Sequence, residues 1–156
     1  MIGYTDVKFE PIDFYVRYYG DFNEEMAHKP IPFNYEMQNV GRAMNGQTGI
    51  FTVHRTGTYY LSATGTALFP YYYQKTRLNF GMGMFRNDNG IGWARSTDLV
   101  DAYKTESFSI QMPVDLIKED QIFLQLDSGH LSAGVFPCDS LFFTGYLLQE
   151  EISQLY

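Results

Sequence analysis

The sequence predicts an all-β protein built as an antiparallel sandwich or jelly roll, and three observations support this prediction. Short segments alternate apolar and polar residues with the period of two that strands require. Gly, Asn, Asp and Pro separate these segments at short intervals. Tyr and Phe, 13 of each among 156 residues, favour pleated surfaces and interfaces. The helical signal is confined to residues 21–28, and Pro30 and Pro32 end it.

Four strands are predicted between residues 13 and 86. They cover residues 13–19, 49–54, 58–68 and 77–86. Around the turn Arg55-Thr56-Gly57, the second and third of them pair as a hairpin. In the later strand of this hairpin Tyr59 and Leu61 share one face, whereas Tyr60 lies on the other among small polar residues. A bulky aromatic ring is unusual on the water-facing side of a half-exposed antiparallel strand.

Four more strands are predicted in the C-terminal half. They cover residues near 91–96, then 106–112, 121–126 and 140–148. The sequence NDNG at 87–90 predicts the turn before the first of them. The last strand is apolar on both faces, with Phe143 and Leu147 on one and Phe142 and Tyr146 on the other. The strands 58–68 and 140–148 therefore each predict a second face that something other than water covers.

Composition indicates one globular domain with a modest acidic charge. Apolar residues make up 45% and charged residues 19% of the chain, which excludes a disordered protein. The formal net charge is −7 and repels phosphate backbones and anionic membranes, so no nucleic-acid partner is expected. Simple solubility explains most of this charge, although cations and basic protein patches remain alternative partners.

The cellular compartment stays open on residue evidence alone. Cys138 is the single cysteine and has no partner for an intrachain disulfide. No stretch approaches the roughly 20 apolar residues of a membrane span, so no membrane insertion is expected. The first residues do not resemble a signal peptide. The chain is therefore either cytosolic or an excised domain that begins with an added Met1.

Three separate stretches carry a resemblance to one family. The first is a spaced pattern of Phe33, Asn39, Phe51, Gly57 and Tyr59, in which Met44, Leu61 and Ala63 stand where aromatic residues are usual. The second is the segment Glu119 to Gln125, and the third is Phe143-Thr144-Gly145-Tyr146-Leu147-Leu148. In these stretches the chain resembles the globular head domain of complement component 1q (C1q), whose family shares the tumour necrosis factor (TNF) jelly roll.

The resemblance implies a C1q/TNF-like jelly-roll sandwich of about ten antiparallel strands. It places an N-terminal arm at residues 1–11, the globular domain at 12–148 and a C-terminal tail at 149–156. Domains of this family form compact homotrimers around the outer face of one sheet, so the apolar second face meets two copies of itself. The expected trimer interface consists of Tyr15, Tyr19, Tyr60, Phe142 and Tyr146.

Calcium is the one cofactor that the resemblance implies. Some family members bind it in loops at the apex of the trimer, through carboxylate and carbonyl oxygens. The matching loop here is RSTDLVDAYKTE, and it offers Asp98, Asp101 and Glu106 as ligands. The third position usually holds Asp and here holds Glu. Solvated loop carboxylates without a metal are the alternative reading.

The segment Phe69-Pro70-Tyr71-Tyr72-Tyr73 joins two strands and carries four rings. Exposed aromatic loops suit recognition, including stacking against sugar rings. The ligand-binding residues expected from this segment are Tyr71, Tyr72 and Tyr73. The alternative is that two or three of these rings cover the end of the sandwich or a neighbouring subunit.

No enzyme is expected. His28, His54 and His130 are scattered along the chain, and Cys138 has no basic neighbour that would lower its pKa. The resemblance instead implies a secreted recognition module, lectin-like and suited to innate immunity. It would bind carbohydrate, a microbial surface or a protein ligand through apical loops. A cytokine-like ligand or a structural trimerisation domain is the alternative, and a hydrolase on a jelly roll is nearly excluded.

Overall fold

The protein folds as two antiparallel sheets packed face to face. The computed structural model describes residues 11–20, 22–72, 74–132 and 141–151. Within them lie a 3-10 helix, η1 (Glu24–Met26), and eleven strands. The strands are β1 (Asp13–Tyr18), β2 (Tyr35–Val40), β3 (Met44–Asn45), β4 (Ile50–Thr52), β5 (Gly57–Phe69), β6 (Thr76–Arg86), β7 (Asn89–Val100), β8 (Lys104–Leu116), β9 (Gln121–Ser128), β10 (His130–Leu131) and β11 (Leu141–Glu150).

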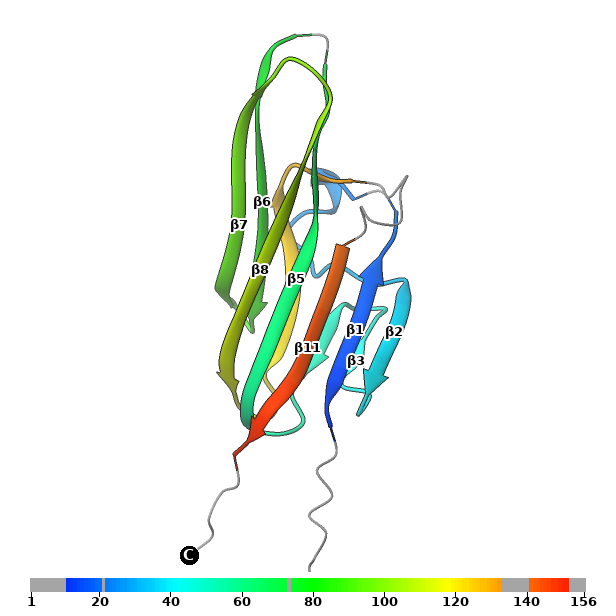
Figure 1. Ribbon diagram of the computed structural model, residues 1–156, viewed down its shortest axis with the longest axis vertical. Helices are drawn as coiled ribbons and strands as arrows, with labels where there is room; N and C mark the ends of the chain where they lie inside the picture. Colours follow the sequence, from blue (N-terminus) through cyan, green and yellow to red (C-terminus); the bar gives the residue numbers. More distant parts are fainter. Residues whose placement is uncertain (1–10, 21, 73, 133–140, 152–156) are drawn as a thin grey trace, which may run out of the picture.

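Sheet A contains β8, β5, β11, β1 and β2, and β10 continues it beside the far end of β5. Figure 1 shows this sheet facing the viewer, with β8 at the left and β2 at the right. Sheet B lies behind it in the order β3, β4, β9, β6 and β7. Every pairing is antiparallel. The predicted jelly-roll sandwich is confirmed.

The core fills the space between the inner faces of the two sheets. Phe14 on β1 packs its ring 4.7 Å from that of Phe51 and 4.9 Å from that of Phe143. Gly145 lies beside this cluster, where a Cβ atom would come within 2.5 Å of the Phe14 ring. Each fully buried ring contributes on the order of 1.5–3 kcal/mol to folding. The close approach at Gly145 explains why a side chain is missing from the middle of a central strand.

The long strands define two ends of the molecule. The connection between β5 and β6 and the connection between β7 and β8 lie together at one end, here called the apical end (Figure 1). At the opposite end β1 begins and β11 ends. β7 and β8 are both longer than the predicted 91–96 and 106–112. Only residues 101–103 connect them, so most of the segment expected to be an apical loop is strand.

Short or exposed elements were missing from the sequence prediction. β2 is an edge strand whose side chains are almost all exposed, and β3 and β10 have two residues each. The helical turn η1 falls within the predicted 21–28, where Asn23 caps it by accepting a hydrogen bond from the Glu25 N–H. No helix in the described part of the chain is long and apolar enough to cross a membrane.

Candidate functional site

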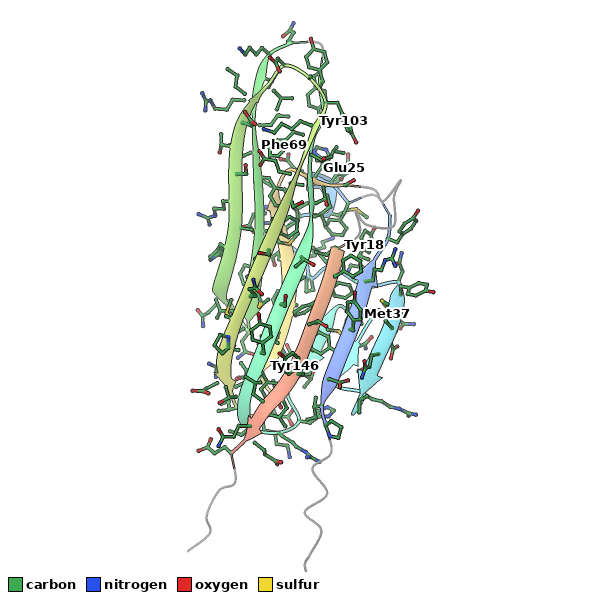
Figure 2. All side chains as sticks on the ribbon, in the orientation of Figure 1. Tyr18, Glu25, Met37, Phe69, Tyr103 and Tyr146 are labelled. Carbon is green, nitrogen blue, oxygen red and sulfur yellow. The ribbon has the colours of Figure 1, made fainter. Side chains whose placement is uncertain are left out.

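The outer face of sheet A carries aromatic rings on adjacent strands. Tyr15 on β1 stacks on Phe142 of β11, with ring centroids 5.8 Å apart. Tyr60 on β5 packs against Tyr146 of β11 at 5.4 Å, and Figure 2 labels Tyr146 on this sheet. The Tyr60 hydroxyl donates a hydrogen bond of 2.6 Å to Gln111 Oε1 on β8. These rings lie opposite the buried core residues of the same strands because side chains alternate across a sheet.

Arg17 connects Tyr19, the fifth expected interface residue, to the other rings on this face. Its guanidinium carbon lies 5.3 Å from the Phe142 ring centroid and 5.9 Å from that of Tyr19. It also lies 5.8 Å from the ring of Tyr35 on β2. Arg17 and Tyr35 were not among the expected interface residues. Tyr35 was missed because β2 was not predicted, and Arg17, on the predicted first strand, because only aromatic residues were included. The cation–π geometry extends the aromatic surface across β1 to the edge of sheet A.

The structure therefore brings all five expected interface residues onto one face. Tyr19 and Tyr146 are 46% and 42% exposed, while Tyr15, Tyr60 and Phe142 are half-buried among their neighbours. We call this surface the sheet A face; it consists of Tyr15, Arg17, Tyr19, Tyr35, Tyr60, Phe142 and Tyr146. A contiguous aromatic surface of this kind is unusual on a monomer. That two further copies cover it stays a prediction.

The three expected calcium ligands occupy different settings. Asp98 lies in β7 and Glu106 in β8, and both are on the inner faces of their strands, between the two sheets. Asp101 lies in the exposed turn between them. Lys104 forms salt bridges with both strand carboxylates, at 2.9 Å from its Nζ to Glu106 Oε1. The ammonium group thus occupies the position between Asp98 and Glu106.

Ser96 completes this polar group, which joins β7 to β8 across the two sheets. Its hydroxyl donates a hydrogen bond of 2.6 Å to Glu106 Oε2. The hydrogen bond from Ser96, followed by that from Lys104, lowers the pKa of Glu106 below its usual value. The four residues Ser96, Asp98, Lys104 and Glu106 are called the polar tie. It fastens the sheets together near the apical end.

The polar tie does not have the form of a calcium site. Calcium takes six to eight oxygen ligands from flexible surroundings, whereas here one ammonium group already pairs with both carboxylates. Among the described residues no group of three or more His, Cys, Asp or Glu side chains is placed to hold a metal. The calcium prediction stays a prediction, and an ion bound by Asp98 and Glu106 has to displace Lys104.

The predicted aromatic loop divides into buried and exposed parts. Phe69 is buried at the end of β5, near the apical end with Tyr103 (Figure 2). Tyr71 and Tyr72 are 41% and 55% exposed. Tyr72 also lines a hollow of about 230 Å³ with Pro70, Arg77 and His130, among others. Tyr73 lies outside the described residues.

The candidate catalytic groups are not assembled into a site. His28 Nδ1 lies 3.9 Å from Asp127 Oδ1, and its side chain is 71% exposed. Within the described ranges no histidine is hydrogen-bonded to a serine hydroxyl. Cys138 lies outside the described residues. This geometry offers no pairing of nucleophile and base of the kind that acyl transfer needs.

Sequence reasoning missed a second aromatic surface, on the outer face of sheet B. Phe123 on β9 stacks on Phe85 of β6 with an interplanar angle of 5° and centroids 5.4 Å apart. Trp93 on β7 meets Phe85 edge to face at 5.3 Å. We call these three residues the aromatic row. The alternation of Ile122, Phe123 and Leu124 was the available signal, but the row depends on the register of three strands, which the sequence does not show.

The fold and these surfaces define a jelly-roll domain of the kind built for binding. The sequence matches the C1q domain family over residues 13–148, which shows that the chain belongs to this family. Its members are generally non-enzymatic modules that bind ligands, often as trimers, and are typically secreted.

The solved structures support the fold assignment. The chain is similar to the globular domain of the zebrafish complement 1qA protein, with a TM-score of 0.63 and 15% sequence identity. The similarity covers 90% of this chain and 99% of the zebrafish one. No curated protein sequence matches the chain significantly. At this identity the likeness shows a shared fold, and ligand and assembly state have to be argued from the residues of this chain.

Proposed function

We propose that the chain is a secreted, non-catalytic recognition module that acts as a homotrimer and binds ligands through its apical end. The ligands are carbohydrates, microbial surfaces or proteins. The observation that carries the assembly is the sheet A face, with its paired rings of Tyr15 and Phe142 and of Tyr60 and Tyr146. A surface rich in Tyr, Phe and Arg is typical of the core of an interface.

Burial of the rings of this surface would favour assembly. Removing one exposed tyrosine body from water contributes on the order of 1.5–3 kcal/mol. Tyr19 and Tyr146 are each more than 40% exposed in the single chain, and a threefold axis repeats each contribution three times. Thr64 and Ser62 lie beside Tyr60 on the same face and leave room for rings from adjacent copies.

The apical end supports ligand binding. Tyr71 and Tyr72 are both exposed there, beyond the buried Phe69. Exposed loops on a rigid sheet scaffold are the usual place for recognition residues. Three copies would present three such loops in one direction, and this multiplies weak single contacts. We include Tyr73 in the proposed ligand surface. Calcium would bind at Asp98, Asp101 and Glu106 if it displaces Lys104.

Light scattering on purified protein tests the assembly. We expect a mass three times the 18.0 kDa of the chain, and a lower mass for Tyr60→Arg. Three arginines would meet in a desolvated centre, which costs several kcal/mol. Tyr103→Arg is the matched control, because Tyr103 is 65% exposed and lies outside the sheet A face. A wild-type monomer at micromolar concentration contradicts the trimer.

A glycan array with the double variant Tyr71→Ser/Tyr72→Ser tests the apical site. We expect ligand binding to disappear while the melting temperature and mass stay unchanged. A large loss of stability would show that these rings are structural. A trimer that binds neither glycans nor microbial surfaces would favour the cytokine-like or structural alternative.

A further inference from the structure

Trp93 lies close against the backbone of sheet B at two glycines. A Cβ atom on Gly83 would come within 2.6 Å of Trp93 Cζ3, and one on Gly90 within 2.5 Å of Cζ2. These two glycines therefore make the space in which the indole rests. Phe85 closes one side of it, edge to face. A ring of this size that is held in place and still 41% exposed presents a fixed apolar surface to solvent.

Polar groups adjoin the aromatic row on the same face. Arg95 on β7 stacks its guanidinium carbon 4.6 Å from the Trp93 ring centroid. In the described part of the chain Arg95 makes no salt bridge, so its N–H donors remain available. The next residue of β6 on this face after Gly83 is Gly81, which pairs with Arg95. A hollow of about 280 Å³ opens over this glycine.

The walls of this hollow carry both donors and acceptors. Arg95 stands on the β7 side and Asp127 on the β9 side, while Asn79 and Thr97 close the apical side. Thr97 donates a hydrogen bond of 2.9 Å to Asn79 Oδ1, which orients the Asn79 amide nitrogen as a further donor. The volume is below the roughly 300–1,000 Å³ of drug-sized sites. It suits one small ring, with a second ring lying over the adjoining row.

We propose that this face of sheet B, the aromatic row together with the hollow over Gly81, binds a neutral oligosaccharide. The apolar face of a pyranose ring packs on Trp93, and its hydroxyls bond with the donors of Arg95 and the carboxylate of Asp127. A planar donor beside a planar acceptor matches neighbouring hydroxyl groups, each of which both donates and accepts. This inference shares a ligand class with the proposed function but needs neither the trimer nor the apical loops.

Charge argues for this occupant. One cation and one anion line the hollow, so the site has no net charge to attract an ionic ligand. The net charge of −7 on the whole chain opposes nucleic acid, which stacks on similar aromatic surfaces. A row of three rings spans two strand spacings, about 9–10 Å, which corresponds to two sugar rings and is short for a protein interface.

The fluorescence of Trp93 gives a direct test because Trp93 is the only tryptophan in the chain. Neutral trisaccharides of glucose, mannose and N-acetylglucosamine, together with any neutral glycan selected on an array, are titrated into the wild-type protein. We expect a saturable change in emission for at least one of them. Arg95→Ala and Asp127→Asn should each weaken that binding by about tenfold or more. Lys118→Ala removes an exposed charge elsewhere and should leave binding unchanged.

Calorimetry with Trp93→Ala extends the test to the ring itself, and Trp93→Phe replaces it if the alanine variant does not fold. We expect loss of binding with alanine and partial retention with phenylalanine. The proposal is overturned if no neutral glycan on the array binds. It is also overturned if binding survives Arg95→Ala but is abolished by Tyr71→Ser/Tyr72→Ser, a result that would support the apical site of the proposed function.

Discussion

At the scale of single residues, Asp120 shows how this fold fixes a turn with one buried carboxylate. Its side chain is 6% exposed and receives hydrogen bonds from the Ile117 N–H, from Asn87 and from Arg86. Burial acts to raise the pKa of Asp120, but these hydrogen bonds and the charge of Arg86 outweigh it, so the pKa lies below its usual value. The residue joins the turn between β6 and β7 to the turn between β8 and β9.

We expect Asp120→Ala to lower the free energy of unfolding at pH 7 by about 1–3 kcal/mol, because the donors it leaves are partly buried. A carboxylate with a depressed folded-state pKa stabilises the protein above its unfolded value of about 3.9 and loses that effect as the pH falls through the folded value. The difference between wild type and variant should therefore shrink below about pH 4. Urea unfolding at pH 7 and pH 3 measures it.

Asp115→Ala is the control for this comparison, because Asp115 is exposed and bonds only to the neighbouring Thr58 hydroxyl among the described residues. It should cost less than about 0.5 kcal/mol. A difference between wild type and Asp120→Ala that is equally large at both pH values would show that packing, and not the ionised carboxylate, holds the turn.

At the scale of elements, the polar tie is a feature that the alternation of the sequence did not predict. Alternation predicted the strands because one face of each is apolar, as with Phe143 and Leu147 in β11. Asp98 interrupts that alternation, and the resemblance assigned Asp98 and Glu106 to an apical loop, so one predicted strand ended at residue 96 and the next began at residue 106. In the structure both continue the inner faces of β7 and β8, and Lys104 forms a salt bridge with each. For Asp98 this cation comes from a neighbouring strand of the other sheet, so the local pattern of β7 does not contain it. Glu106 shares β8 with Lys104, but the pattern of β8 does not show that Asp98 joins them.

The two aromatic surfaces differ in how far the sequence predicts them. The sheet A face was predictable because Tyr60 and Tyr146 each break the alternation within a single strand. The aromatic row was not, because Phe85 and Trp93 come together only through the shifted register between β6 and β7. Periodicity reports which face a residue occupies, whereas contacts across strands depend on register.

Lys104→Met tests whether the polar tie also competes with calcium. The variant leaves Asp98 and Glu106 without their cation, so we expect calcium to raise its melting temperature more than that of the wild type. Differential scanning fluorimetry in chelator and in millimolar calcium measures the response. Lys75→Met removes the same charge from an exposed position near the apical end and serves as the control. Equal responses of the two variants would show that calcium does not bind at Asp98 and Glu106.

At the scale of the whole molecule, assembly should be coupled to stability. If the sheet A face is buried between copies, the folded state gains stability with protein concentration. We expect the melting temperature to rise between about 1 and about 100 µM chain, and Tyr60→Arg to abolish that rise. Tyr103→Arg should retain it. A wild-type melting temperature that is independent of concentration would mean that the face is covered by something other than copies of the chain.

The position of the chain ends has a practical consequence for measuring any of this binding. β1 begins and β11 ends side by side, far from the connections that carry Tyr71 and Tyr72 (Figure 1). A tag placed at either terminus would therefore anchor the molecule by the same pole. On a sensor chip or a bead, the apical end would point into the sample. The outer face of sheet B would remain accessible as well. Immobilisation chemistry at random lysines, some of which lie near the apical end, would obscure surfaces that terminal capture leaves clear.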